Sequence, residues 1–168
     1  MKQALFLQIV MAPGNVRAIL AGAKTQTRRL AWRPDGRPTR WRQLHDRVRA
    51  GEAVTLWVRE AHAFDADGTP IYRATTARTD VRRWRSPIHM PWRACRLTLT
   101  LTDTRLAPVT AISEADARAE GAPPSADGTH RAGFREMWES LHGRGAWDAD
   151  PEVVALSFTA HRWDEQNA

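Results

Sequence analysis

The amino-acid sequence predicts an α+β fold, a small barrel of about five to seven mostly antiparallel strands with two or three short helices. Two observations favour this fold class. Runs of β-forming residues recur along the 168-residue chain, one of them with strict period-2 alternation, and short helical segments lie between some of these runs. The pattern lacks the regular succession of strands and crossover helices that a parallel βαβ sheet requires.

The first half of the chain contains three predicted strands and one predicted helix. Pro13 and Asn15 open the helix, and Gly22 suits its C′ position because glycine adopts a left-handed conformation readily. The Asp-Gly pair at residues 67–68 favours a hairpin turn, since both residue types tolerate a positive φ. The strands are expected over residues 5–10, 54–60 and 71–74.

The second half contains the clearest strand, over residues 96–106. Its leucines alternate with threonines, so we expect Leu97, Leu99 and Leu101 to face the core and the threonines at 98, 100 and 102 to face solvent. A strand over residues 153–160 closes the chain.

Two helices are predicted between these strands. Ser113 caps the first, which runs to about Glu120, and Asp116 follows three residues later as in a capping box. The second covers roughly residues 132–141, with an apolar face of Phe134, Met137, Trp138 and Leu141.

A chain of this length fits one domain, and we expect residues 1–168 to form it, with a basic insert around residues 30–52. The insert is rich in Arg, Pro and Gly and is expected to be a long exposed excursion. Cys95 is the only cysteine, so no internal disulfide can form, and no Cys/His cluster has the spacing of zinc ligands. We therefore expect neither a metal nor another cofactor.

The N-terminal segment has a short apolar run but no small-residue cleavage site. No stretch approaches the roughly 20 apolar residues that span a bilayer. We expect a soluble, cytoplasmic protein that does not engage a membrane. The sequence indicates no particular oligomeric state.

Charge is distributed unevenly along the chain. The net charge is +9 for residues 1–49, +3 for residues 50–96 and −6 for residues 97–168. A basic N-terminal half attracts polyanions through Coulomb forces and counterion release. A general bias toward arginine does not explain the acidic C-terminal half, so the asymmetry favours contact with a nucleotide or a nucleic acid.

Lysine is rare in this chain. Only two of the 25 basic residues are lysines, Lys2 and Lys24. Lys2 lies at the terminus, where almost any residue is tolerated, whereas Lys24 occupies a position where arginine was the default. Because lysine can lose its proton and arginine effectively cannot, Lys24 is a candidate base.

The run GAKTQTRR at residues 22–29, directly after the first predicted helix, resembles the G-x-K-x-x-E-x-R signature of the ASCH domain family. Further blocks resemble phage-associated ASCH proteins, in the same order along the chain. They are LWVRE at 56–60, SPIHMP at 86–91, the Leu/Thr strand, ISEADARAEG at 112–121, and WD at 147–148 with the final strand. The resemblance covers nearly the whole chain and implies a PUA-like β-barrel.

Thr27 stands where the family signature often has Glu. This is similar to the ASCH proteins that act as N4-acetylcytidine amidohydrolases, which have K-T-x-T at this place. In those enzymes the lysine, the second threonine and a glutamate late in the following helix carry the chemistry. By position, the resemblance implies Lys24, Thr27 and Glu120 as catalytic residues, with Glu60 as the reserve carboxylate. Positions i and i+3 of a strand face opposite ways, so Lys24 and Thr27 can cooperate only across a bend.

The remaining candidates are binding residues. Several tryptophans lie among arginines, an interleaving that base stacking beside phosphate contacts uses. The same tryptophans also suit a cover over the barrel. The candidate contacts to substrate or nucleic acid are Arg28, Arg29, Arg40, Arg42, Arg47, Trp57 and Arg59.

Two functions of different classes follow. The first is an amidohydrolase that removes an acyl group from an N4-acylated cytosine nucleoside. Lys24 would take the proton from Thr27 or from a water, or would stabilise the oxyanion if an ionised Glu120 keeps it charged. The second is a non-catalytic RNA-binding module, and a single-strand ribonuclease is a third possibility. The expected partner is a modified cytidine or RNA.

Overall fold

The computed structural model describes residues 4–163. Within this range the chain has seven strands, four α-helices and three short 3₁₀ turns. The strands are β1 (Leu5–Val10), β2 (Gln26–Leu30), β3 (Val54–Arg59), β4 (His62–Phe64), β5 (Pro70–Tyr72), β6 (Leu97–Pro108) and β7 (Glu152–Arg162). The helices are α1 (Pro13–Leu20), α2 (Arg40–Arg49), α3 (Glu114–Ala119) and α4 (His130–His142), and the turns are η1 (Pro87–His89), η2 (Trp92–Ala94) and η3 (Val109–Ala111).

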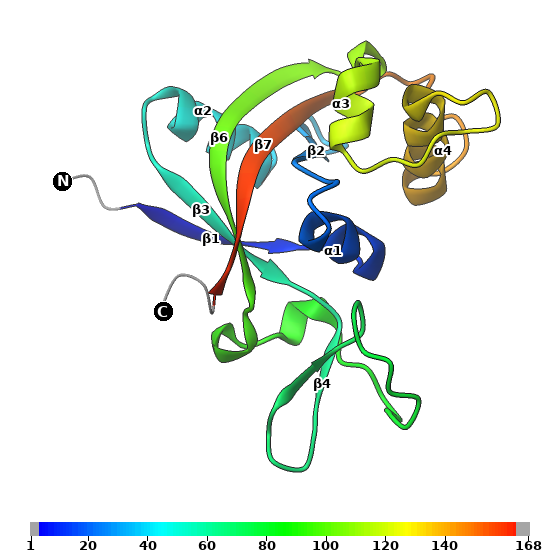
Figure 1. The fold of residues 1–168 in the computed structure, drawn as a ribbon. Helices are drawn as coiled ribbons and strands as arrows, with labels where there is room; N and C mark the ends of the chain where they lie inside the picture. Colours follow the sequence, from blue (N-terminus) through cyan, green and yellow to red (C-terminus); the bar gives the residue numbers. More distant parts are fainter. Residues whose placement is uncertain (1–3, 164–168) are drawn as a thin grey trace.

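Five strands form one curved sheet in the order β1-β3-β6-β7-β2. The β1–β3 pair is parallel, and the other neighbouring pairs are antiparallel. The long strands β6 and β7 curve together, with α3 and α4 beyond one end, and the β4–β5 hairpin projects at the opposite end (Figure 1). The predicted α+β class is confirmed: the sheet curls into a half-barrel, as expected for a small PUA-like barrel.

The concave side of the sheet holds the main hydrophobic core. Strand residues such as Ile9, Leu56, Leu99 and Leu156 are buried there, and α1 adds side chains to the same cluster. A second, smaller cluster lies between α3, α4 and the β6–β7 end, and it comprises Val109, Ile112, Ala117, Ala122, Phe134, Trp138, Trp147 and Val153.

Residues 30–52 differ from their prediction. They contain α2, whose first turn is capped by the Thr39 hydroxyl accepting from the amide of Arg42. Leu44 of this helix is 2% exposed and belongs to the main core. The segment is therefore not one exposed excursion: one apolar side of a strongly basic helix packs on the barrel, and its charged side faces solvent.

The predicted alternation along β6 is correct for its leucines at 97 and 99 but wrong for Thr98, which is fully buried. Thr98 pairs with Trp57 on β3 and with His161 on β7. Cross-strand partners share a face of the sheet, so large side chains cover the convex side here as well. Trp57 packs edge-to-face on Trp92 at 5.2 Å, which extends this cover. Farther along, a register shift between residues 101 and 103 interrupts the alternation, and Leu101 is only half-buried.

The apolar face of α4 is shorter than predicted. Phe134 and Trp138 are buried, but Leu141, in the last turn, is 73% exposed. Leu141 lies outside the second core cluster. None of the helices within residues 4–163 has the length and apolar character needed to cross a membrane.

Candidate functional site

Lys24 lies where the chain leaves α1 and enters β2. Its amide donates to the carbonyl of Ala18 at 3.1 Å, and the amide of Thr25 donates to the carbonyl of Ala119 at 2.7 Å. The turn is thereby tied to the end of α3. Gly121 has a φ of +75°, and a Cβ there would lie 3.2 Å from the Cβ of Lys24. Glycine allows both this conformation and this close approach.

The Lys24 ammonium is buried against the carboxylate of Glu120. Its Nζ donates to Oε2 of Glu120 at 2.8 Å and to the backbone carbonyl of the same residue at 2.9 Å. Arg28 Nη1 donates to the other carboxylate oxygen at 3.1 Å. Lys24 and Glu120 are 2% and 3% exposed, so both charges of this pair have left water. Burial lowers the pKa of Lys24 below its ordinary value of 10.5, although the Glu120 carboxylate acts in the opposite direction.

Asp116 anchors the second side of Arg28. Arg28 Nη2 lies 3.1 Å from Oδ2 of Asp116, and Arg105 Nη2 donates to the same oxygen at 3.0 Å. Gln26 donates to Oδ1 at 3.0 Å. Partial burial raises the pKa of Asp116, but the hydrogen bonds from Arg105 and Gln26 and the charges of both arginines outweigh it, so the net direction is downward. Arg28 is therefore held between two carboxylates of α3 and its C-cap.

Thr27 is also buried, at 2% exposure, but it lies on the other face of β2 from Arg28. Its partner on β7 is Leu156, a residue of the main core. Arg28 reaches the α3 carboxylates on the opposite face, as described above. Lys24 lies two residues before the first residue of β2, and its ammonium donates to Glu120, with no hydrogen bond to the Thr27 hydroxyl among the described residues. The structure thus brings Lys24 and Arg28 together on the Glu120 carboxylate, whereas Thr27 lies on the face of β2 opposite to Arg28, beside the main core.

β2 is an edge strand of the sheet, and a cavity of about 410 Å³ lies along its open side. Its walls come from β2, the start of α2 and the end of α4: Arg28, Arg29, Leu30, Arg33, Thr39, Arg40, Trp41 and His142. None of these residues is acidic. Four of them are arginines, so the cavity is positively charged. Burial and the charge of the nearby Arg29 lower the pKa of His142, which favours its neutral form.

Trp41 supplies an aromatic surface inside this cavity. The guanidinium of Arg40 lies 4.2 Å from its ring centroid, and that of Arg29 lies at 5.7 Å. Arg29 also donates to the carbonyl of Val10 at 3.0 Å, which fixes its direction. Both guanidinium groups lie over the ring, so cation–π contacts hold the two cations beside Trp41.

A second cavity, of about 590 Å³, adjoins the pair from the other side of Gly121. It lies between α1 and α4 and is lined mainly by small or apolar residues, including Ala18, Met137 and the exposed Leu141. Lys24, Thr27 and Glu120 do not themselves line either cavity. Their neighbours Arg28, Arg29 and Gly121 do, so the buried pair lies directly behind the cavity walls.

Glu60, the reserve carboxylate, belongs to a different cluster. It is 1% exposed, and Arg96 donates two hydrogen bonds to its carboxylate, from Nε to Oε1 at 2.8 Å and from Nη2 to Oε2 at 2.9 Å. The Arg96 guanidinium lies 3.9 Å from the ring centroid of Tyr72. This arrangement attaches the β4–β5 hairpin to the sheet.

The remaining candidate binding residues lie apart from the Lys24 pair. Arg42 pairs with Asp46, one turn further along α2. Arg47 lines a third cavity beside α2, and its Nε and Nη2 both donate to Oε2 of Glu52, at 2.9 and 2.7 Å. Trp57 and Arg59 lie together on the outside of β3, where Arg59 donates to the carbonyl of Met90. Of the seven predicted contacts, Arg28, Arg29 and Arg40 share the cavity along β2.

Sequence reasoning misses three participants. It marks Asp116 only as a capping-box residue, and it singles out neither Gln26 nor His142. Nothing local in the sequence marks His142, because it reaches the cavity from the far end of α4. Asp116 and Glu120 are four residues apart and so share one side of a helix, a spacing that could have indicated a double carboxylate site.

Within residues 4–163, no three His, Cys, Asp or Glu side chains gather in a way that could hold a metal ion. No protein-family model and no curated protein matches the chain. Among solved structures, protein EF3133 from Enterococcus faecalis V583, described by the family model DUF984, matches with 13% identity. The match covers 100% of this chain and 83% of that chain with a TM-score of 0.45, a likeness from which we infer nothing about function.

Proposed function

We propose that this protein is an amidohydrolase that removes the acyl group from an N4-acylated cytosine nucleoside. The observation that carries the proposal is the buried Lys24, whose Nζ lies 2.8 Å from the Glu120 carboxylate. A lysine with a lowered pKa beside a carboxylate offers a base and an acid within one hydrogen bond. The resemblance of residues 22–29 to ASCH amidohydrolases supports the same assignment.

The reaction begins with attack of an oxygen on the acyl carbon. Either the Thr27 hydroxyl or a water that it positions adds to the carbonyl, and Lys24 takes the proton that this oxygen loses. The carbonyl becomes an oxyanion, and the bond between the acyl carbon and N4 then breaks. N4 leaves with a proton returned by Lys24 or Glu120, which gives the free cytosine. Attack by water yields the carboxylic acid directly, and attack by Thr27 yields an ester that a water hydrolyses.

The protonation state of Lys24 decides its role. Burial favours the neutral amine, which is the form that accepts a proton, whereas the Glu120 charge favours the ammonium. Arg28 occupies the second oxygen of Glu120 and so reduces the field of that carboxylate at Lys24. With Arg28 in place, the lysine deprotonates more easily, and the base role is the favoured one.

The cavity along β2 suits the nucleoside. A volume of about 410 Å³ lies within the range of sites that bind small molecules. Trp41 contributes aromatic surface to the wall, and Arg29 can donate to the carbonyl oxygen of a cytosine ring. Lys24 lies behind the Arg28 wall of this cavity, so turnover requires that wall to move and admit the acyl group.

The direct test is incubation of the purified protein with N4-acetylcytidine, followed by chromatographic detection of cytidine. Lys24→Arg keeps the charge but removes the exchangeable base, so it should abolish hydrolysis. Thr27→Ala should be inactive, and Thr27→Ser should retain part of the activity. Glu60→Gln is the matched control, because it alters a buried ion pair outside the cavity and should leave kcat unchanged in the folded fraction.

Loss of activity counts only where circular dichroism shows a folded variant. Retention of most activity by Lys24→Arg would contradict the base assignment and favour oxyanion stabilisation instead. No turnover by the wild-type protein of N4-acetylcytidine or related N4-acylated nucleosides would refute the amidohydrolase.

A second candidate function is RNA binding without catalysis, favoured by the charge of the same surface. Four arginines and no acidic residue line the cavity along β2, and Trp41 lies among them. The Arg33→Gln, Arg40→Gln double variant should weaken binding of single-stranded RNA and lower the slope of log Kd against log salt by about 1.4. An unchanged slope would refute this contact surface.

A further inference from the structure

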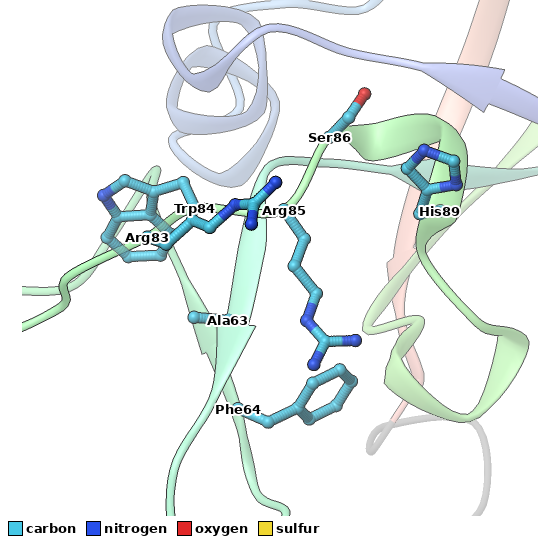
Figure 2. Close-up of a pocket in the computed structure, with 7 residues that line it drawn as sticks. All are labelled: Ala63, Phe64, Arg83, Trp84, Arg85, Ser86 and His89. Atoms are coloured by element: carbon cyan, nitrogen blue, oxygen red, sulfur yellow. The ribbon is translucent and has the colours of Figure 1, made fainter.

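A separate cavity of about 660 Å³ lies at the base of the β4–β5 hairpin. It is formed by β4 and by the segment that leads into η1, and its lining residues are Ala63, Phe64, Arg83, Trp84, Arg85, Ser86 and His89. Figure 2 shows the indole of Trp84 on one side, the imidazole of His89 on the other, and the Arg85 side chain reaching toward the ring of Phe64 between them. None of these residues belongs to the site around Lys24.

The backbone fixes this cavity in place. Arg85 forms an antiparallel bridge with His62, with hydrogen bonds of 3.3 and 2.7 Å in the two directions. This bridge occupies the edge of β4 that β5 leaves free. The His62 ring also packs edge-to-face on Phe64 at 5.4 Å. The aromatic floor and one cation are therefore held by the fold before any ligand arrives.

The positive charge of the cavity is not neutralised by the protein. None of its lining residues is acidic, and within residues 4–163 no carboxylate forms an ion pair with Arg83, Arg85 or Arg93. Arg85 and Arg93 instead lie over the Phe64 ring, at 5.3 and 4.6 Å from its centroid. The nearby Arg78 differs, because it is already paired with Asp80. Exposed guanidinium groups without carboxylate partners are available for an anion.

The chemistry required of a ligand follows from these walls. It needs a flat ring to stack on Trp84, and it needs anionic groups spaced to meet arginines that lie two residues apart. Single-stranded nucleic acid has both, since unpaired bases expose their faces and phosphates recur along the backbone. A double helix hides the faces of its bases, so it should bind only through charge.

We propose that this hairpin cavity is a binding site for a single-stranded RNA segment, with a base stacked on Trp84 and phosphates held by Arg83 and Arg85. The site lies on the hairpin, at the end of the sheet opposite α3 and α4 (Figure 1). It therefore adds a contact for a polymeric substrate or ligand that is independent of the Lys24 site.

The test is fluorescence anisotropy with a short labelled oligouridine over a series of salt concentrations. Arg83→Gln with Arg85→Gln should lower the slope of log Kd against log salt by about 1.4, at about 0.7 for each lost phosphate contact on a single strand. Trp84→Ala should weaken binding about tenfold, whereas Trp84→Phe should retain most of the affinity. Arg118→Gln with Arg135→Gln is the charge-matched control on α3 and α4, and it should leave the slope nearly unchanged.

Two further arms distinguish this site from the Lys24 site and from binding through charge alone. The double arginine variant should hydrolyse free N4-acetylcytidine at the wild-type rate, so a loss of RNA affinity with intact turnover isolates the hairpin site. A duplex of the same length should bind more weakly than the single strand. The proposal is overturned if the Arg83/Arg85 variant and the control change the slope equally, if Trp84→Ala binds as the wild type does, or if the duplex binds as tightly.

Discussion

Gly133 provides a sharp test of how α4 is seated, because its replacement by alanine has opposite effects on the isolated helix and on the folded protein. An alanine in a helix normally stabilises by about 1 kcal/mol relative to glycine. At Gly133, however, a Cβ would lie 1.8 Å from the carbonyl oxygen of Pro123 and 3.0 Å from its carbonyl carbon. Both atoms are backbone, so no side-chain rotation relieves the overlap.

The magnitude follows from the displacement required. An ordinary contact begins at 3.4 Å, so the loop of Pro123 and the helix must separate by about 1.6 Å, which is 3.4 minus 1.8. Overpacking of this kind costs about 1–3 kcal/mol, and backbone displacement places it at the upper end. We expect Gly133→Ala to lower the free energy of unfolding by about 2–3 kcal/mol and the Tm by roughly 5–10 °C for a chain of this size.

The assay is urea unfolding followed by circular dichroism, with the m-value compared between variants. Gly14→Ala is the matched control: Gly14 also lies in a helix, α1, and the nearest atom to its added Cβ is the flexible end of Arg17 at 3.9 Å. Gly14→Ala should be neutral or stabilising. If Gly133→Ala were stabilising too, α4 could not lie as close to the Pro123 loop as described.

Four further outcomes are expected. Because burial lowers the pKa of Lys24, kcat/KM for N4-acetylcytidine should rise about tenfold per pH unit and level off below pH 10.5, and a flat profile would contradict the base role. The folded state releases the Lys24 proton at a lower pH than the unfolded state does, so this group's contribution to stability, measured by urea unfolding against Lys24→Met, should increase as pH rises toward 10.5. Glu60→Gln should lower the free energy of unfolding by about 2 kcal/mol, because Arg96 loses its charged acceptor. Arg47→Gln removes an exposed ion pair with Glu52 and should leave the urea midpoint almost unchanged. Burial raises the pKa of the Cys95 thiol, so a thiol reagent should modify it only at the rate of unfolding, and immediate modification would contradict its burial.

Local signals in the sequence predicted most of the elements, because they depend on interactions between near neighbours. Proline at the start of α1 and glycine after its end bracket that helix, and the Ser113 hydroxyl accepts from the amide of Asp116 as the capping box predicts. The Asp-Gly pair lies in the hairpin between β4 and β5, with Gly68 at a φ of +79°. Backbone sterics and side-chain periodicity are local, so one sequence suffices to detect them.

The same signals failed where the environment of a strand or helix is set by distant segments. Thr98 alternates like a solvent-facing residue, but neighbouring strands place Trp57 and His161 beside it. Residues 30–52 are so basic that their composition did not indicate α2. One buried leucine, Leu44, and an amphipathic arrangement are enough to pack this helix on the sheet. Periodicity in the sequence indicates which face of a strand or helix is apolar, but only the packing of distant segments decides which faces are covered by other side chains.

The candidate site shows the same division. The sequence alone marked Lys24, as one of two lysines among 25 basic residues, and the resemblance of residues 22–29 to a known motif pointed to Glu120. Only the tertiary structure decided that these two side chains meet across 96 positions, that Arg28 joins them, and that Glu60 belongs to Arg96 instead. The physical reason is that β2 pairs with β7 at the sheet edge while the loop after α3 folds back onto α1, and such long-range closure depends on the whole chain.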